Sequence, residues 1–203
     1  MIEKTTGIYS LLSNPFVYSI GQKISGGTPF RRKIVKKFIF KNGAKVLDIG
    51  CGPADLLDSM PEVDYYGYDT NSSYINHAKK RYKNRGKFYC KKFTSKDIKK
   101  LPKFDHVLLF GVLHHLSDAE IIKLMSLLKK KLKKTGNIIT VEPVYIPNQN
   151  PFEKFVIKMD RGSNVKSKKE YVSLMKKYFK KNQVNIYHQI FFPFTWIVMN
   201  CKN

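Results

Sequence analysis

Acidic residues are scarce in this chain, which has 15 Asp and Glu against 38 Lys and Arg among its 203 residues. The resulting net charge of +23 has two interpretations. One is an anionic partner, such as nucleic acid or a membrane surface; the other is a lysine-rich composition that only decorates solvent-facing positions. No aromatic and basic stripe typical of a nucleic-acid platform accompanies the charge. We therefore favour the second interpretation, with nucleic acid as the less favoured partner.

Cysteines and long hydrophobic runs are also scarce. Cys51, Cys90 and Cys201 are far apart and odd in number, which excludes a disulfide framework and the ligand spacing of a zinc site. No apolar run approaches the roughly 18 residues of a membrane-spanning helix, and no basic, apolar and small-residue signal stands at the beginning. These features predict a cytoplasmic protein without a transmembrane segment, and they leave the oligomeric state open.

The rest of the chain is organised around residues 45–55, which read KVLDIGCGPAD. The apolar, partly β-branched run in 46–49 predicts a buried parallel strand. This strand breaks at Gly50 and Gly52, before a helix-compatible segment at 54–60. Such a turn lets the backbone approach a ligand closely, with helix N–H groups aimed at it. A nucleotide-like cofactor is the usual occupant of this arrangement.

Missing residues narrow the choice of cofactor. The dinucleotide fingerprint needs a third glycine where the chain has Asp55, and no G-K-[ST] of a phosphate loop follows. Asp48 at the strand tip would repel a pyrophosphate, but it suits a cation or an amine. The octapeptide V-L-D-I-G-C-G-P resembles the first motif of class I S-adenosylmethionine (SAM) methyltransferases, whose cofactor carries an amino group and a sulfonium. The alternative interpretation is an ordinary βα turn.

This resemblance extends over roughly residues 30–203 and implies a SAM-dependent methyltransferase with SAM as its cofactor. The implied fold is α/β, a Rossmann-like seven-stranded class I methyltransferase sheet with helices on both faces and an N-terminal helical lid. Strand and helix alternate five times along the sequence before two terminal strands, which agrees with that fold. We expect a single methyltransferase domain, 1–203, with lid helices at 1–40, a SAM-binding core at 44–143 and a substrate-side insertion at 144–180.

A second acid lies about twenty residues past the glycine turn, at the end of the next predicted strand. Asp69 is placed there to accept both ribose hydroxyls, because a carboxylate offers two oxygens. The alternative is a helix cap, although Ser72 and Ser73 can cap the following helix.

The third predicted strand lacks the acid that relatives commonly use to hold the adenine amino group. Lys91, Lys92, Phe93 and Thr94 stand there instead. The resemblance leaves Phe93 to flank the adenine and Thr94, or Asp97, to bond it. The expected cofactor-binding residues are Asp48, Gly50, Gly52, Asp69, Thr70, Phe93, Thr94 and Phe110.

Two adjacent histidines follow the fourth predicted strand, where strand ends of an open parallel sheet face the ligand crevice. The segment F-G-V-L-H-H-L at 110–116 resembles the post-strand motif of small-molecule methyltransferases. His114 or His115 is suited to take the proton of a substrate hydroxyl as the methyl group transfers, since a histidine titrates near neutrality. Either could instead hold the loop through a backbone hydrogen bond. Glu142, after the fifth strand, is a second base, an orienting partner for a histidine or a plain strand-end acid.

The remaining candidates concern the substrate side. Tyr9, Tyr18 and Arg31 fall in the portion that the resemblance assigns to the lid, where they could touch SAM or substrate; core packing explains the tyrosines as well. Arg161 in the insertion is suited to bind an acidic or hydroxylated substrate, or to form a structural turn with Asp160. No metal is predicted, because the segment around Gly111 has no carboxylate.

Three classes of function follow. The first is O-methylation of a hydroxyl of a sugar, glycan or other small molecule, and residues 142–166 resemble bacterial methyltransferases from surface-polysaccharide gene neighbourhoods. The second is an RNA or protein methyltransferase that uses the basic surface, although the [DN]-P-P-[YF] signature is missing after the fourth strand. The third is a non-catalytic SAM-binding partner subunit. We favour the first.

Overall fold

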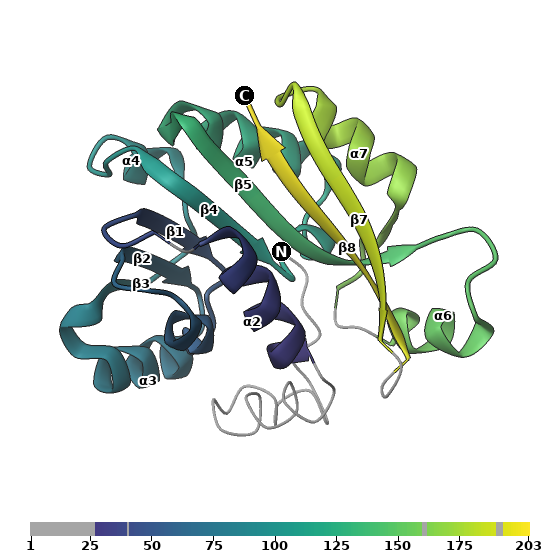
Figure 1. Cartoon of the computed structure of the whole chain (residues 1–203), viewed down its shortest axis with the longest axis horizontal. Coiled ribbons are helices and arrows are strands. Elements are labelled where there is room, and N and C mark those ends of the chain that lie inside the picture. The colour runs from purple at the N-terminus through teal and green to yellow at the C-terminus, as the bar shows by residue number, and fades with distance from the viewer. Residues whose placement is uncertain (1–26, 40, 160–161, 190–192) are drawn as a thin grey trace.

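The computed structural model describes residues 27–39, 41–159, 162–189 and 193–203 (Figure 1). Its centre is a sheet with the strand order β3-β2-β1-β4-β5-β8-β7, and the short β6 pairs with the end of β5. Neighbours from β3 to β5 are parallel, whereas β8 runs antiparallel to both β5 and β7. The strands are β1 (Lys45–Ile49), β2 (Asp64–Asp69), β3 (Gly86–Cys90), β4 (Phe104–Phe110), β5 (Leu132–Tyr145), β6 (Lys166–Ser167), β7 (Lys181–Gln189) and β8 (Phe194–Lys202).

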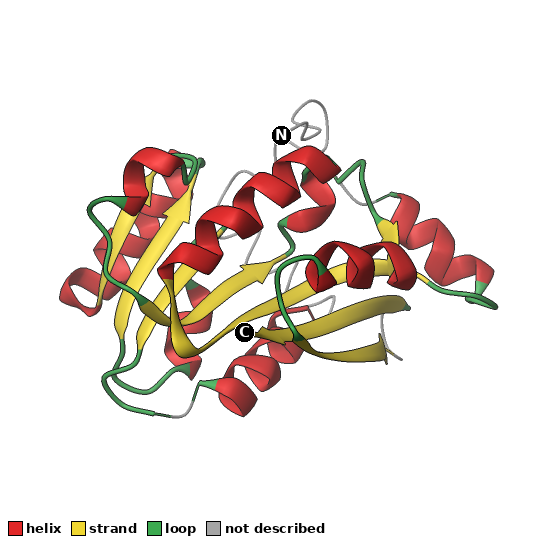
Figure 2. Ribbon diagram, turned by 90° about the horizontal axis from the view of Figure 1, so that it is seen from above, coloured by secondary structure: helices red, strands yellow, loops and turns green. Residues whose placement is uncertain are grey.

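Helices cover both faces of this sheet (Figure 2). Side chains of α4, α5 and α7 pack into one apolar cluster, and those of α2, α3 and α6 pack into another on the opposite face. The predicted sheet of seven strands with helices on both faces is therefore confirmed, and β6 is an addition to it. The helices are α2 (Gly27–Phe38), α3 (Ser72–Tyr82), α4 (Ser95–Ile98), α5 (Asp118–Lys131), α6 (Pro151–Lys158) and α7 (Lys168–Lys176), with 3₁₀ turns η2 (Asp55–Ser59), η3 (Lys83–Arg85) and η4 (Leu113–His115).

The alternation of side chains along β1 decides where its acid lies. Leu47 and Ile49 belong to the cluster under α5 and α7, whereas Val46 belongs to the cluster under α2 and α3. Successive side chains of a strand point to opposite faces. Asp48 therefore shares the face of Val46 and points toward α2, at the end of the strand.

Two local segments differ in structure from what their composition suggests. Residues 25–29 read SGGTP, a composition typical of a loop, but α2 begins at Gly27. Pro29 is tolerated in the first turn because that turn needs no N–H partner. Residues 132–137 read LKKTGN, which is typical of a helix end followed by a turn, yet β5 already begins at Leu132. There Gly136 lies against β4, where a Cβ would stand 2.9 Å from the carbonyl oxygen of Phe104. Close backbone approach, not a turn, explains that glycine.

The described part of the predicted lid is α2, and the rest of that segment lies outside the described residues. No helix in the described ranges is long and apolar enough to cross a membrane.

Candidate active site

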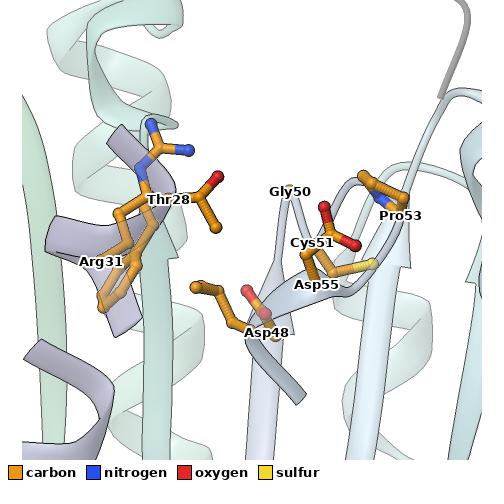
Figure 3. A pocket seen from close by; sticks show the side chains of 9 residues that line it. Thr28, Arg31, Asp48, Gly50, Cys51, Pro53 and Asp55 are labelled. Carbon is orange, nitrogen blue, oxygen red and sulfur yellow. The ribbon is translucent and has the colours of Figure 1, made fainter. Parts of the chain in front are cut away.

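The carboxyl ends of β1 and β4 open into a pocket of about 400 Å³, a volume that includes open solvent. In Figure 3 the α2 side chains face the turn after β1 across this space. The lining residues are Thr28 and Arg31 from α2, Phe110 at the end of β4, and Asp48, Gly50, Cys51, Pro53, Asp55 and Leu56 from the β1–η2 connection.

The turn after β1 has a backbone that favours glycine. Gly50 has φ +73°, and a Cβ there would lie 2.6 Å from Cγ2 of Val112. Gly52 also has a positive φ, of 55°. The amides of Gly50 and Cys51 donate to the carbonyl of Tyr68 at 2.7 and 3.1 Å, which ties the turn to the end of β2. A side chain at position 50 would meet both backbone strain and a steric clash, so a bare backbone faces the pocket here.

Asp48 is buried in the floor of this pocket, with 1% of its surface exposed. Its Oδ2 accepts a 2.7 Å hydrogen bond from the hydroxyl of Tyr65. Burial raises the pKa of Asp48 to about 7, against the opposing effects of the Tyr65 hydrogen bond and the Arg31 charge. A cation bound in the pocket would favour the ionised carboxylate. The site is thus suited to a positively charged ligand group.

Tyr65 reaches Asp48 because Gly67 leaves room for its ring. A Cβ on Gly67 would stand 2.9 Å from both the Tyr65 ring and the Cys51 sulfur. Gly67 is also the register partner of Asp48 between β1 and β2. The glycine in β2 is therefore part of the support of the Asp48 carboxylate.

Asp69 holds the glycine turn from the neighbouring strand. Its Oδ2 accepts from the amide of Gly52 at 2.9 Å, and its Oδ1 accepts from the amide of Asn71 at 2.8 Å. The carboxylate therefore lies directly beside the glycine turn. The ribose role of Asp69 stays a prediction, as does a cofactor contact by the exposed Thr70. The expected serine caps are wrong, because Asn71 caps α3 through the amide of Tyr74 at 3.1 Å.

Structural roles account for the residues expected at the adenine. Phe93 is buried and packs edge-on against Tyr68, with ring centroids 5.3 Å apart. The amide and hydroxyl of Thr94 both donate to Oδ2 of Asp97 at 2.9 Å, and Lys91 pairs with the other oxygen. Neither Phe93 nor Thr94 lines the pocket of Figure 3. Their adenine contacts stay predictions.

The carboxylate of Glu142 organises the loop that follows β4. Glu142 is completely buried, and its Oε1 accepts from the amides of Val112 and Leu113 at 3.0 and 2.9 Å. Its Oε2 accepts from the amide of His114 at 3.4 Å and lies 2.6 Å from Nδ1 of the same residue. Among the sequence-based alternatives for Glu142, this geometry supports an orienting partner for a histidine.

The two histidines therefore have different surroundings. His114 pairs with Glu142, whereas the ring of His115 lies beside the His114 ring, with centroids 4.1 Å apart. The His114 ring also lies beneath Gly162, where a Cβ would stand 1.9 Å from its Cδ2. The amide of Asn164 donates to the His114 carbonyl at 2.9 Å. Residues from the insertion thus cover the histidine, which is 4% exposed.

Arg31 connects the cofactor side of the crevice to the histidine side. A Cβ on Gly111, which has φ +73°, would lie 2.9 Å from Nη2 of Arg31 and 3.7 Å from Cε1 of His114. The guanidinium also lies 5.5 Å from the centre of the Trp196 ring. Arg31 therefore lines the pocket of Asp48 and lies beside Gly111, which in turn lies close to the His114 ring.

Sequence reasoning missed two residues of this crevice. Thr28 follows two glycines in a segment with the composition of a loop, and it lines the pocket from the first turn of α2. Gly162 lies close to His114, and the sequence signals this only by a glycine in a polar insertion. The predicted contacts Tyr9, Tyr18 and Arg161 lie outside the described residues.

No group of three or more His, Cys, Asp or Glu that could hold a metal ion occurs within the described ranges. The expectation of no metal stays a prediction. By contrast, the residues present fit SAM: a buried acid for its amino group, a bare glycine turn for close approach, and Asp69 beside that turn.

Comparisons with known proteins agree with this site. Residues 40–192 match the sequence model of a family described as a methyltransferase domain. Similar solved structures include the mitomycin 7-O-methyltransferase MmcR (TM-score 0.67, 16% identity, 98% of this chain and 62% of that one) and the pyocyanin biosynthetic protein PhzM (0.72, 13%, 98% and 63%). The plantazolicin methyltransferase BpumL, solved with S-adenosylhomocysteine, matches with a TM-score of 0.64, 17% identity and coverage of 96% and 93%.

The chain spans under two thirds of the length of MmcR and PhzM, and at these identities the likeness shows the fold. No curated protein matches the sequence. The family match covers three quarters of the chain, and the fold has the expected sheet with helices on both faces. The chain therefore belongs to the SAM-dependent methyltransferase-domain family, as the V-L-D-I-G-C-G-P motif predicted.

Proposed function

We propose that this protein methylates a hydroxyl group of a small molecule, with a sugar or glycan hydroxyl as the favoured acceptor. The observation that carries the proposal is the buried pair of His114 Nδ1 and Glu142 Oε2, 2.6 Å apart, at the carboxyl ends of β4 and β5. SAM supplies the methyl group as a sulfonium electrophile and leaves as a neutral thioether. The chain itself then has to bind the cofactor, orient the acceptor and take up its proton.

On the cofactor side, we assign the amino group of SAM to Asp48, whose carboxylate faces the pocket. The turn at Gly50 and Gly52 offers backbone without side chains, and we assign the ribose hydroxyls to the carboxylate of Asp69, which lies beside that turn. Phe110 at the end of β4 closes the pocket beside them.

On the acceptor side, Glu142 holds Nδ1 of His114, and we assign the uptake of the hydroxyl proton to Nε2 of the same ring. A buried carboxylate behind an imidazole fixes the ring and stabilises its protonated form. Because Gly162 covers the Cδ2 side of the ring, the acceptor reaches Nε2 once residues 162–164 shift. His115, whose ring lies beside that of His114, serves as the control position.

The choice of a sugar rests on two observations. Residues 142–166 resemble methyltransferases from polysaccharide gene neighbourhoods, and the crevice presents hydrogen-bonding groups from Thr28 and Arg31. Hydroxyl-rich acceptors need such donors and acceptors to orient them.

The experiment is transfer of labelled methyl from SAM to free sugars, glycan fragments, total RNA and a protein lysate, with His114→Ala and His115→Ala in parallel. We expect label in a sugar or glycan. His114→Ala should lower the rate by about 10²–10⁴-fold, the usual contribution of a general base. His115→Ala should retain most of the rate, and both variants should still bind SAM.

Other outcomes would overturn the proposal. Label in RNA or protein, lost at high salt, would assign the function to the basic surface. SAM binding without label in any acceptor would favour a non-catalytic partner subunit. Equal losses in the two histidine variants would contradict the role given to the His114–Glu142 pair.

A further inference from the structure

The most exposed large apolar side chains of the described chain all lie on one short helix. Phe152 and Phe155 of α6, and Met159 directly after it, are 59%, 57% and 56% exposed. In Figure 1, α6 lies at the lower right, beside the ends of β7 and β8. Exposed apolar side chains that gather in one place mark an interaction surface more often than scattered ones do.

Their spacing places these three side chains on a single stripe. Positions 152, 155 and 159 are separated by three and four residues, so they lie above one another on a helix. Lys154 and Lys158 are also exposed and stand beside this stripe, whereas Ile157 is completely buried. The outer face of α6 therefore combines an apolar stripe with an edge of lysines.

The inner side of α6 is hydrogen-bonded to the sheet, so the helix cannot rotate to bury the stripe. Oε2 of Glu153 accepts from the hydroxyl of Thr195 at 2.7 Å, and its Oε1 lies 3.3 Å from Nδ1 of His188. The side chain of Asn150 caps the first turn through the amide of Phe152 at 2.8 Å. The exposure of the aromatic stripe is thus a consequence of how the helix is anchored.

The exposed charges on this helix have one sign. Within α6, Lys154 and Lys158 are exposed, whereas its acid, Glu153, is buried. The whole chain carries a net charge of +23. An acidic surface is the complement of this face.

We propose that α6 docks the protein on an anionic lipid surface, with Phe152, Phe155 and Met159 in the headgroup region and the flanking lysines against phosphates. Aromatic and aliphatic side chains on one face and lysines at its edge are the pattern of helices that lie in a membrane interface. Anionic headgroups attract each lysine near the surface. A second copy of the chain is a poorer partner, because a two-fold contact would bring Lys154 and Lys158 of both copies around the same small patch.

The test is co-sedimentation of the full chain with vesicles of phosphatidylcholine alone and of phosphatidylcholine mixed with phosphatidylglycerol. We expect binding to the mixed vesicles only, weakened by added salt. The affinity of the double variant Phe152→Ser/Phe155→Ser for the mixed vesicles should fall by at least about tenfold, because the substitutions remove most of the apolar stripe. It should fold normally, because both side chains are exposed.

Matched charge variants distinguish binding through α6 from a general attraction between the positively charged protein and the vesicles. Lys154→Gln/Lys158→Gln should weaken binding by several fold, whereas Lys168→Gln/Lys169→Gln removes the same charge from exposed positions of α7 and should have a much smaller effect.

Three results would overturn the proposal. They are no binding of the wild type to anionic vesicles, equal binding of the Phe152→Ser/Phe155→Ser variant, and equal losses in the two lysine pairs. A wild-type dimer in light scattering that becomes a monomer in the phenylalanine variant, with no vesicle binding by either, would assign the face to self-association instead.

Discussion

Two buried carboxylates, Asp48 on β1 and Glu142 on β5, lie on the strands on either side of β4. Their hydrogen-bonding surroundings differ greatly. Both are nearly inaccessible, with 1% and 0% of their surface exposed. Glu142 accepts three backbone amides and faces Nδ1 of His114. Within the described part of the chain, Asp48 accepts one side-chain hydrogen bond, from Tyr65.

The difference indicates which carboxylate serves the fold and which serves a ligand. A buried carboxylate is stable when hydrogen bonds fill its lone pairs, and costly when they do not. Glu142 meets that condition with groups of its own chain, and so fixes the η4 loop and the His114 ring. Asp48 does not, and burial raises its pKa to about 7. A cationic group bound in the pocket would provide Asp48 with the hydrogen-bond donors that the chain itself does not supply.

The largest expected effect is in Glu142→Gln. The substituted amide places N–H donors against the backbone amides of Val112 and Leu113 or against His114, so at least one buried donor loses its partner. We expect the free energy of unfolding to fall by about 4 kcal/mol, measured by urea denaturation. Glu120→Gln, at an exposed helix cap, should cost about 1 kcal/mol and serves as the control. A similarly small loss of unfolding free energy in both variants would contradict the conclusion that Glu142 stabilises the fold.

Asp48→Asn, by contrast, should raise the stability of the unliganded protein. Because the folded pKa of Asp48 lies above its unfolded value, the folded state binds more protons between about pH 4 and 7, and its stability falls as pH rises through that window. The shift from 3.8 to about 7 corresponds to at most about 4 kcal/mol.

We expect Asp48→Asn to be more stable than the wild type by about 3 kcal/mol near pH 8, with no difference near pH 4. Thermal and urea unfolding at both pH values measure it. A variant that is less stable than the wild type at the higher pH would contradict a strained, ligand-facing Asp48.

Gly162→Ala tests the position of the His114 ring, the partner of Glu142. The added methyl would lie 1.9 Å from Cδ2 of His114, so either the ring or the covering segment must move. We expect a loss of about 2 kcal/mol in stability and a lower rate of methyl transfer, while SAM affinity is retained. The exposed Ser163→Ala is the matched control. Unchanged transfer by Gly162→Ala would mean that the His114 ring position does not limit the reaction.

The smallest effect is expected in Tyr65→Phe. It removes the hydroxyl that donates to Asp48, which costs about 1 kcal/mol near pH 8, where that carboxylate is ionised. The loss should shrink at lower pH as Asp48 takes up a proton, and urea unfolding at both values measures it. A loss independent of pH would show that the hydroxyl does not act through Asp48.

Much of this arrangement was predictable because it depends on local pattern. The apolar run in 46–49 and the glycines at 50 and 52 predicted β1 and its turn, and the structure has both. The same motif placed Asp48 at the strand tip. Its hydrogen bond to Tyr65 was not predictable, because it requires the parallel register that sets Gly67 opposite Asp48.

What sequence could not give depends on contacts between distant segments. The two histidines were equivalent in the sequence, and the position of Glu142 in β5 pairs it with His114. The cover of His114 by Gly162 likewise joins residues almost fifty positions apart. At Leu132, pairing with β4 overrides local helix and turn signals.

The most direct test of the contrast is the dissociation constant of SAM, measured by calorimetry near pH 8 for the wild type, Asp48→Asn and Glu142→Gln. We predict that Asp48→Asn binds SAM about tenfold more weakly, because a charged acceptor for the amino group is lost. Glu142→Gln should stay within about threefold of the wild type, although it unfolds more easily. Unchanged affinity in Asp48→Asn, or a larger loss in Glu142→Gln, would contradict the division of roles between the two carboxylates.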